Sequence, residues 1–182
     1  MIKQFMLSGA VTLGVMTSAI AGPYYAGLSY VDSEISTRES VESNGYAITV
    51  GRKLDLLSNV DTAVQITYAE HGDDDFTSDN GNPLNGETTS TEIAAVFAYD
   101  LGFAKPFVLL GYEATDFDFS GASGSGSIDD DGFYYGVGLD YALGENLGLR
   151  FEMTYDEFKD TSDGANEEFD VETIRLGLIR NF

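Results

Sequence analysis

Apolar and polar residues alternate along most of the chain from about residue 24 onward. In the segment GLDYALGENLGLRFEMTY at 138–155, large apolar side chains occupy every second position on both sides of a GEN triplet. Successive side chains of a β-strand point to opposite faces, so this segment predicts a hairpin with one apolar face and one small or charged face. If the triplet 144–146 is a three-residue loop, Asp140 stands directly opposite Arg150, with Glu152 one diagonal step away.

The same alternation recurs along the chain and predicts an all-β protein. The expected strands lie at about 24–33, 44–54, 61–70, 89–100, 106–117, 133–143, 147–156 and 170–182. The connections between them are alternately long and short, which is the layout of a meander of antiparallel hairpins. Beyond the N-terminus no run approaches 18 consecutive apolar residues, so a helical membrane span is excluded. We expect an eight-stranded antiparallel up-and-down β-barrel.

The two faces of these strands differ enough to predict which one meets water. One face carries a large aliphatic or aromatic residue at nearly every position, and the other carries glycine, serine, threonine and charged residues. The interior of an eight-stranded barrel barely admits side chains, so the bulky face must point outward and the glycine-rich face inward. Arg52 and Arg180 fall in the apolar register, but near strand ends, where they can reach lipid phosphates. We therefore expect a transmembrane barrel rather than a soluble one.

Charged residues on the inward face predict a network inside the barrel. Its expected members are Lys53, Glu92, Glu113, Asp140, Arg150, Glu152 and Arg175. Unpaired charges in a narrow lumen are costly, so we expect the three bases to pair with the four acids. The alternative is that these charges are merely hydrated.

The N-terminus has the layout of a secretory signal peptide. Lys3 precedes an apolar run at 5–16, and Ala19-Ile20-Ala21 is a small-residue cleavage site. The run is too short to span a bilayer, which needs about 20 residues. We expect cleavage after Ala21, export, and a barrel domain at 22–182. The chain has no cysteine, so disulfides do not hold this domain together.

The net charge of the chain limits the classes of molecule that it can bind. The chain has 31 acidic and 9 basic residues and a formal net charge of −22. Such a chain repels nucleic acid, so nucleic-acid binding is excluded as a function class. We expect no cofactor, because the chain has no glycine-rich phosphate loop and no cluster of histidine and cysteine ligands.

The acidic residues concentrate in the long connections, in HGDDDF at 71–76 and SIDDDG at 127–132. The carboxylates of Asp73, Asp74, Asp75, Asp129, Asp130 and Asp131 are ligands of the type that calcium and magnesium use. No glutamate follows at the twelfth position of a calcium loop. Three possibilities stay open: a solvated acidic surface, a cation site, or bridging through divalent cations to lipopolysaccharide phosphates.

Three segments resemble a known family. They are GVGLDYALGENLGLRFEMTY at 136–155, KPFVLLGYE at 105–113 and VETIRLGLIRNF at 171–182. They are similar to the small eight-stranded outer-membrane β-barrels of Gram-negative bacteria, which are grouped with the barrel domain of outer membrane protein A. The resemblance covers essentially the whole mature chain and implies an outer-membrane location. Terminal Phe182 is similar to the signal that the barrel-assembly machinery reads, and no peptidoglycan-binding domain is expected to follow it.

The resemblance leaves function open, because the family includes structural anchors, adhesion or serum-resistance proteins and a few enzymes. Its enzymes, lipid A deacylases and palmitoyl transferases, rely on histidine and serine. Here His71 opens a long connection, with Ser78 and Ser90 nearby. The His-x-Ser spacing of the deacylases is absent, and we expect a solvated loop histidine and no enzyme.

Two functions remain. The first is a non-enzymatic, monomeric barrel with a structural or surface-interaction role, which contacts lipid and lipopolysaccharide through its acidic loops. The alternative is a narrow cation-preferring pore or small-solute transporter. The expected pairing of lumen charges favours the first.

Overall fold

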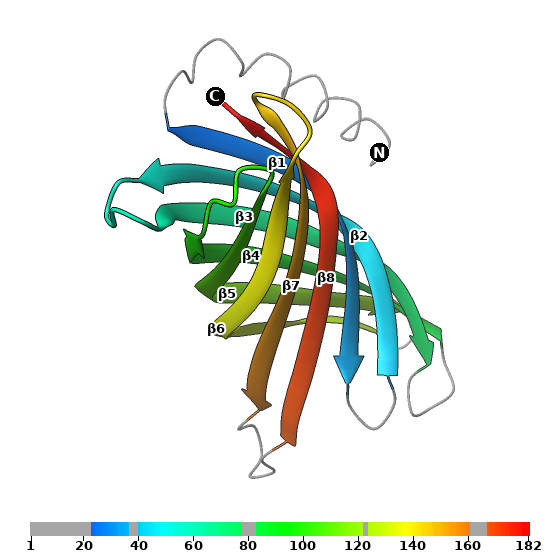
Figure 1. The fold of residues 1–182 in the computed structure, drawn as a ribbon. Coiled ribbons are helices and arrows are strands. Elements are labelled where there is room, and N and C mark those ends of the chain that lie inside the picture. The colour runs from blue at the N-terminus through cyan, green and yellow to red at the C-terminus, as the bar shows by residue number, and fades with distance from the viewer. Residues whose placement is uncertain (1–22, 37–39, 78–82, 122–123, 161–166) are drawn as a thin grey trace.

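The computed structural model describes residues 23–36, 40–77, 83–121, 124–160 and 167–182. These residues form one closed antiparallel barrel in which each strand pairs with the next (Figure 1). The strands are β1 (Tyr24–Ser36), β2 (Ser40–Leu54), β3 (Asp61–Thr77), β4 (Pro83–Ala98), β5 (Ala104–Gly121), β6 (Gly124–Ala142), β7 (Leu147–Asp160) and β8 (Glu167–Asn181). The predicted fold class is confirmed. No helix in these ranges is long and apolar enough to cross a membrane.

β8 closes the barrel against β1, where Tyr25 pairs with Asn181. The three short turns and the start of β1 and end of β8 lie at one end of the barrel in Figure 1. In the small outer-membrane barrels that the sequence resembles, the short turns are periplasmic and the long connections extracellular, so we name this end the periplasmic end. In the turn between β6 and β7, the amide of Leu143 donates to the carbonyl of Leu147 at 2.9 Å, as the predicted three-residue loop requires.

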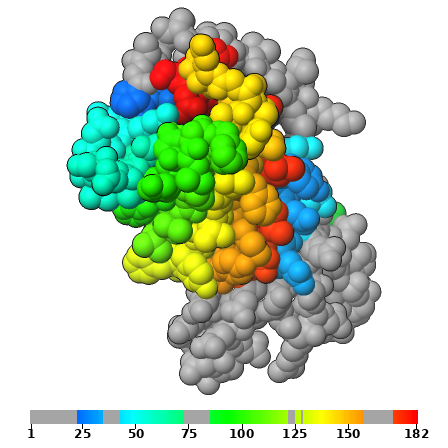
Figure 2. Space-filling view, in the orientation of Figure 1, coloured from blue at the N-terminus to red at the C-terminus, as the bar shows by residue number. Residues whose placement is uncertain are grey.

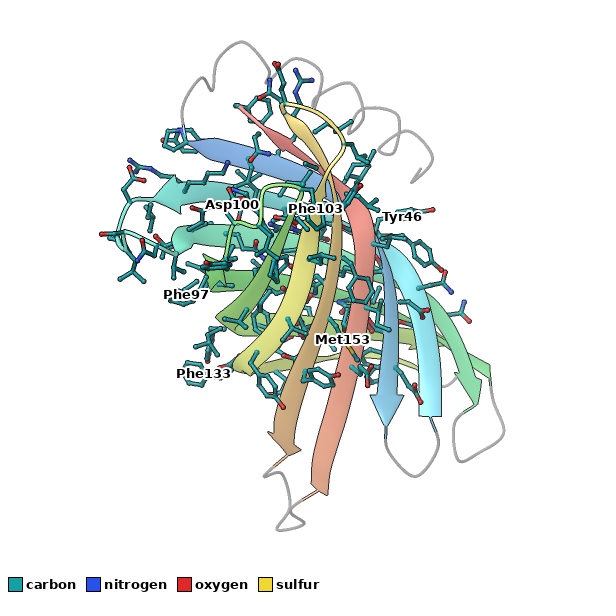
Figure 3. The ribbon with its side chains drawn as sticks, viewed as in Figure 1. Tyr46, Phe97, Asp100, Phe103, Phe133 and Met153 are labelled. Carbon is teal, nitrogen blue, oxygen red and sulfur yellow. The ribbon has the colours of Figure 1, made fainter. Side chains whose placement is uncertain are left out.

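The apolar face of every strand points outward. Phe133 is 82% exposed and Leu110 60%, whereas the inward residues Thr67 and Thr154 are almost fully buried. Figure 3 shows Phe97 and Phe133 projecting away from the wall. Cross-strand ring pairs, Tyr30 with Tyr46, Tyr112 with Phe133 and Tyr135 with Tyr155, lie on the outer surface. An apolar outer surface with rings toward its edge is the surface that lipid requires, so the predicted orientation of the faces is confirmed.

The strands are longer than the sequence predicted. β5 and β6 pair up to Gly121 opposite Gly124, and β3 pairs with β4 as far as Thr77. The predicted strand boundaries near 70, 89, 117 and 133 were therefore wrong, because the strands extend to Thr77, Pro83, Gly121 and Gly124. Beyond the lipid band both faces of a hairpin are hydrated, so the backbone ladder continues without the apolar alternation that marked the strands within the band.

A β-bulge interrupts β3 at this boundary. The pairing with β4 gains one residue on β3 between Glu70 and Asp73, and Gly72 adopts a φ of 93°. Glycine populates positive φ at little cost, which suits it to this position. His71 lies two residues after the inward residue Ala69, and its side chain also points into the barrel, where it is buried.

Aromatic rings inside the barrel lie over glycines. A Cβ on Gly51 would stand 2.1 Å from the ring of Tyr25, and one on Gly111 2.3 Å from the ring of Tyr134. In both cases the ring and the glycine are direct cross-strand partners. A missing side chain on one strand therefore lets the ring of the next lie flat against the wall. This arrangement leaves the barrel axis free for charged side chains.

Candidate functional site: the barrel lumen

Two layers of charged residues and an apolar cluster fill the lumen. The apolar cluster consists of Ala94, Val96, Phe107, Leu109 and Tyr134, all at most 4% exposed. Val96, Phe107 and Leu109 come from the neighbouring strands β4 and β5. The cluster therefore packs against one side of the wall, and the arginines at the centres of the two charged layers extend from β7 and β8.

Arg150 is the centre of the periplasmic layer. Its Nε and Nη2 each donate to an oxygen of Asp140 at 2.7 Å, and its Nη1 donates to Oε1 of Gln65 at 2.9 Å. The guanidinium also lies 4.7 Å from the ring centroid of Phe107 and 5.2 Å from that of Tyr25. The N–H groups of the guanidinium are thus hydrogen-bonded and its plane lies near two rings, which holds the side chain in one position.

Arg175 is the centre of the extracellular layer. Its Nη1 donates to Glu92 and to Glu152, both at 2.9 Å, and its Nη2 donates to the second oxygen of Glu92. All three side chains are at most 3% exposed. Glu152 on β7 is the direct cross-strand partner of Arg175 on β8, whereas Glu92 reaches the same guanidinium from β4, so the cluster connects β4 to β7 and β8 across the lumen. Removing one partner of such a buried cluster typically costs about 3–5 kcal/mol.

Two further carboxyl groups stand beside this cluster. Asp156 and Glu113 lie within hydrogen-bonding reach of each other, and Oδ1 of Asp156 is buried with no partner. An ionised carboxylate can only accept hydrogen bonds. Two carboxyl groups can therefore hydrogen-bond to each other only when one of them carries a proton. Arg175 is already occupied by two other acids, which leaves these carboxyl groups without a base of their own.

The predicted network is present in part. The structure brings Asp140 to Arg150, and Glu92 and Glu152 to Arg175. Glu113 accepts from the hydroxyl of Thr115 at 3.0 Å instead of pairing with a base. Lys53 forms no ion pair with any acid that the structure describes. Lys53 is the last inward residue of β2 and lies at the periplasmic rim. The acids of the extracellular layer lie on the other side of Gly51 along the barrel. The prediction that Lys53 joins the network was therefore wrong.

Lys53 lines a cavity of about 480 Å³ that opens at the periplasmic end. The rings of Tyr141 and Phe103 contribute to its wall, and Arg150 with Asp140 forms its inner limit. At its rim Lys105 pairs with Asp61 and Asp100, each at 2.7 Å. The hydrogen bonds from Lys105 and from the Gly102 amide lower the pKa of the Asp100 carboxyl.

His71 is not the solvated loop residue that the sequence predicted. Its side chain is 6% exposed, and Nδ1 and Nε2 are hydrogen-bonded to the hydroxyls of Ser33 at 2.9 Å and Ser90 at 3.0 Å. The hydroxyl of Ser33 also contacts that of Thr173 at 3.0 Å. Both ring nitrogens are occupied, and both serines are at most 3% exposed, so a substrate cannot reach a nucleophile here. Ser78 lies outside the described residues.

The acidic triplets lie on strands. Asp129, Asp130 and Asp131 are exposed on β6, and the hydroxyl of Tyr112 donates to the carboxylate of Asp131. The backbone of 73–75 belongs to β3, while the side chains there lie outside the described residues. Within the described ranges, no three carboxylate or histidine side chains converge as metal ligands. The cation site stays a prediction.

Tyr25, Tyr134 and Asp156 are lumen residues that the sequence did not predict, and Gln65, which the alternation places on the inward face, was not expected to contact the charged network. Each of the four lies in the inward register of its strand, two residues from another inward position. Extending the alternation by one step would have placed them inside.

The sequence matches the model of the outer membrane protein β-barrel domain over residues 5–182. The chain belongs to this family. Its members share a barrel in the outer membrane, and this is where the protein resides. No curated protein sequence matches the chain.

Solved barrels are similar in fold. Neisserial surface protein A is 14% identical with a TM-score of 0.67, and the match covers 88% of this chain and 98% of that one. Ail, the attachment invasion locus protein of Yersinia pestis, is 16% identical with a TM-score of 0.62, over 90% and 100%. OprG of Pseudomonas aeruginosa is 14% identical with a TM-score of 0.52, over 87% and 94%. At these identities the likeness concerns the fold alone.

Proposed function

We propose that the protein is a closed, non-enzymatic and monomeric membrane anchor that displays an acidic surface outside the cell. The observation that carries this proposal is the Arg175 cluster, in which Glu92 and Glu152 hold one guanidinium across the lumen. Beside it the apolar cluster around Leu109 excludes water from one side of the barrel. An eight-stranded barrel has little interior to spare, and these side chains occupy it.

The acidic surface lies just outside the lipid band. Asp116 is directly opposite Asp129, and Glu87 is directly opposite Asp118; all four are exposed. Like charges directly opposite each other destabilise a strand pair unless a counter-ion lies between them. Divalent cations would relieve this repulsion and would also bridge the strands to lipopolysaccharide phosphates, which is the contact we propose for this surface.

The sign of the charge separates this chain from one neighbour. A second structure of Ail is a complex with the heparin analogue sucrose octasulfate, a polyanion. Carboxylate-rich strands repel polyanions. We therefore propose that the partner of this protein is cationic or is bound through cations.

Ion conductance in a planar bilayer tests the closed barrel. The refolded protein is first checked by the mobility difference between boiled and unboiled samples on a gel. A folded but silent barrel supports the anchor. Stable cation-selective steps would instead support the alternative function, a narrow cation-preferring pore, for which the periplasmic cavity would be the entrance.

Binding to lipopolysaccharide tests the surface. We expect retention on lipopolysaccharide vesicles in millimolar Mg²⁺, loss with chelator, and weakening in the double variant Asp116→Asn, Asp129→Asn. The matched control is Glu145→Gln, an exposed acid in a periplasmic turn. Equal retention of both variants would contradict the proposed contact.

A further inference from the structure

The seam where β8 closes against β1 carries two arginines on the lipid side of the barrel. Arg52 on β2 is the direct partner of Tyr24 on β1, and Arg180 on β8 is the direct partner of Ala26, also on β1. The amide of Phe182 donates to the carbonyl of Tyr24 at 3.0 Å, which ties the end of the chain to the start of β1. Figure 2 shows these two ends of the chain together at one end of the molecule.

Both guanidiniums lie over aromatic rings. That of Arg52 is 5.7 Å from the ring centroid of Tyr24, and that of Arg180 is 5.6 Å from the ring centroid of Phe182. A guanidinium stacked on a ring uses its face and keeps its N–H edge free to donate. The rings therefore restrict the two side chains without neutralising their charge.

Neither arginine has an acid partner among the described residues, and both are exposed. The two lumen arginines, in contrast, are fully paired with carboxylates, and exposed Lys105 pairs with two aspartates. The chain has a net charge of −22, yet these two guanidiniums on its outer surface have no acid partner among the described residues. An anion from outside the chain would balance their charge.

Their depth in the membrane identifies the kind of anion. The next outward residues toward the barrel centre are Val50 beside Arg52 and Leu178 beside Arg180, both in the apolar band. In the opposite direction, β2 reaches a periplasmic turn and β8 reaches the end of the chain. The guanidiniums thus lie where lipid hydrocarbon gives way to headgroup phosphates. They flank one strand, β1, and their partners on it are two residues apart, so their backbones are about 12 Å apart, with Tyr24 and Ala26 between them.

We propose that Arg52, Arg180 and the rings of Tyr24 and Phe182 form a binding site for the headgroup of an anionic phospholipid in the periplasmic leaflet. The two forks donate to phosphate oxygens, and the lipid chains lie along the apolar face of β1 over Ala26 and Leu28. This site is independent of the acidic extracellular surface, since it is at the opposite end of the barrel and has the opposite charge.

The test uses the full protein as purified from outer membranes, in nanodiscs of phosphatidylcholine with one fifth phosphatidylglycerol. Native mass spectrometry counts the lipids that stay bound. We expect phosphatidylglycerol to be enriched roughly tenfold over phosphatidylcholine, and this enrichment to disappear in the double variant Arg52→Gln, Arg180→Gln. The matched control, Lys105→Gln, removes an exposed but paired base at the same end and should keep the enrichment.

Two further variants separate the effect of charge from those of the ring and of folding. Tyr24→Leu retains both charges but removes one ring, and should reduce the enrichment only in part. Gel mobility checks that each variant is folded; if the double variant does not fold, Arg52→Lys with Arg180→Lys replaces it, and should lower the enrichment because lysine lacks the planar fork.

Equal enrichment in wild type and in the charge variants would overturn the site. So would thermal stabilisation by inorganic phosphate in pure phosphatidylcholine that matches the effect of phosphatidylglycerol, because the site would then select a free anion rather than a lipid.

Discussion

Phe107 lies flat over Gly138, its direct cross-strand partner inside the barrel. A Cβ on Gly138 would stand 2.2 Å from Cζ of Phe107 and 2.5 Å from the carbonyl oxygen of Phe151. The ring in turn supports the guanidinium of Arg150 at 4.7 Å. Glycine at this position therefore lets a phenylalanine and an arginine occupy the same level of a narrow lumen.

We predict that Gly138→Ala destabilises the barrel by about 1–3 kcal/mol, because the added methyl group meets both a ring and a backbone oxygen that cannot move aside together. The chain has no tryptophan, so unfolding in guanidinium is followed by circular dichroism or gel mobility. Gly144→Ala is the control, since nothing lies within 4 Å of the added Cβ in that turn. Equal midpoints for the two variants would show that the lumen is less tightly filled than the structure indicates.

Arg150 and Asp140 should be energetically coupled. The bidentate contact at 2.7 Å predicts that Asp140→Asn and Arg150→Gln are each destabilising, and that the double variant loses less than the sum by 1 kcal/mol or more, on the order seen for contacting charged pairs. The measurement is a double-mutant cycle on refolded protein. A second cycle, of Asp140→Asn with Arg180→Gln, should be additive because Arg180 is on the outer face. Additivity in the first cycle would mean that the two charges do not stabilise one another.

This pair was predictable from sequence, whereas other parts of the lumen were not. Strand alternation and the length of one turn are local, and together they set Asp140 opposite Arg150. Contacts across the lumen depend on how the barrel closes. Glu92 reaches Arg175 from β4, which is not a neighbour of β8, and alternation says only that both residues point inward. That is why Lys53, also inward and lining the same cavity as Asp140 and Arg150, was assigned an acid partner that it does not have among the described residues.

His71 and Asp156 show a second limit. Both are polar residues just past the last apolar position of their strands, where the sequence offers no contrast between the two faces. In that region both a turn residue and an inward residue of a hydrated hairpin are polar, so the sequence does not distinguish them. His71 continues the inward alternation of Gln65, Thr67 and Ala69, but the sequence does not show that the strand extends that far.

Asp156 and Glu152 should respond in opposite ways to neutralisation. Four acids, Glu92, Glu113, Glu152 and Asp156, surround the single base Arg175. Glu152→Gln removes a partner of a buried guanidinium and should cost about 3 kcal/mol or more. Asp156→Asn replaces a carboxyl group that has no base of its own by a neutral amide of the same shape, so stability should be unchanged or raised. Midpoints of guanidinium unfolding at constant pH compare the two, with exposed Asp129→Asn as a control expected within about 0.5 kcal/mol of wild type. A large loss in Asp156→Asn would show that its carboxylate has a role in the lumen that the contacts do not reveal.

The ion pairs of Lys105 should matter far less than those of Arg150. Lys105 contacts Asp61 and Asp100 at 2.7 Å, but all three side chains are 36–53% exposed. Exposed pairs are screened by water and salt, so Lys105→Gln should cost less than about 1 kcal/mol, and less still in high salt.

The pH dependence of this small loss follows from Asp100. Hydrogen bonds from Lys105 and from the Gly102 amide lower its pKa in the folded barrel. A carboxyl whose pKa is lower folded than unfolded stabilises the protein above its unfolded value, and this contribution disappears as the pH falls through the folded value. The difference between wild type and Lys105→Gln should therefore be present at pH 7 and shrink in acid, as measured by unfolding at both pH values in low salt. A difference that stays the same on acidification would mean that Lys105 stabilises the turn through packing of its aliphatic stem rather than through its charge.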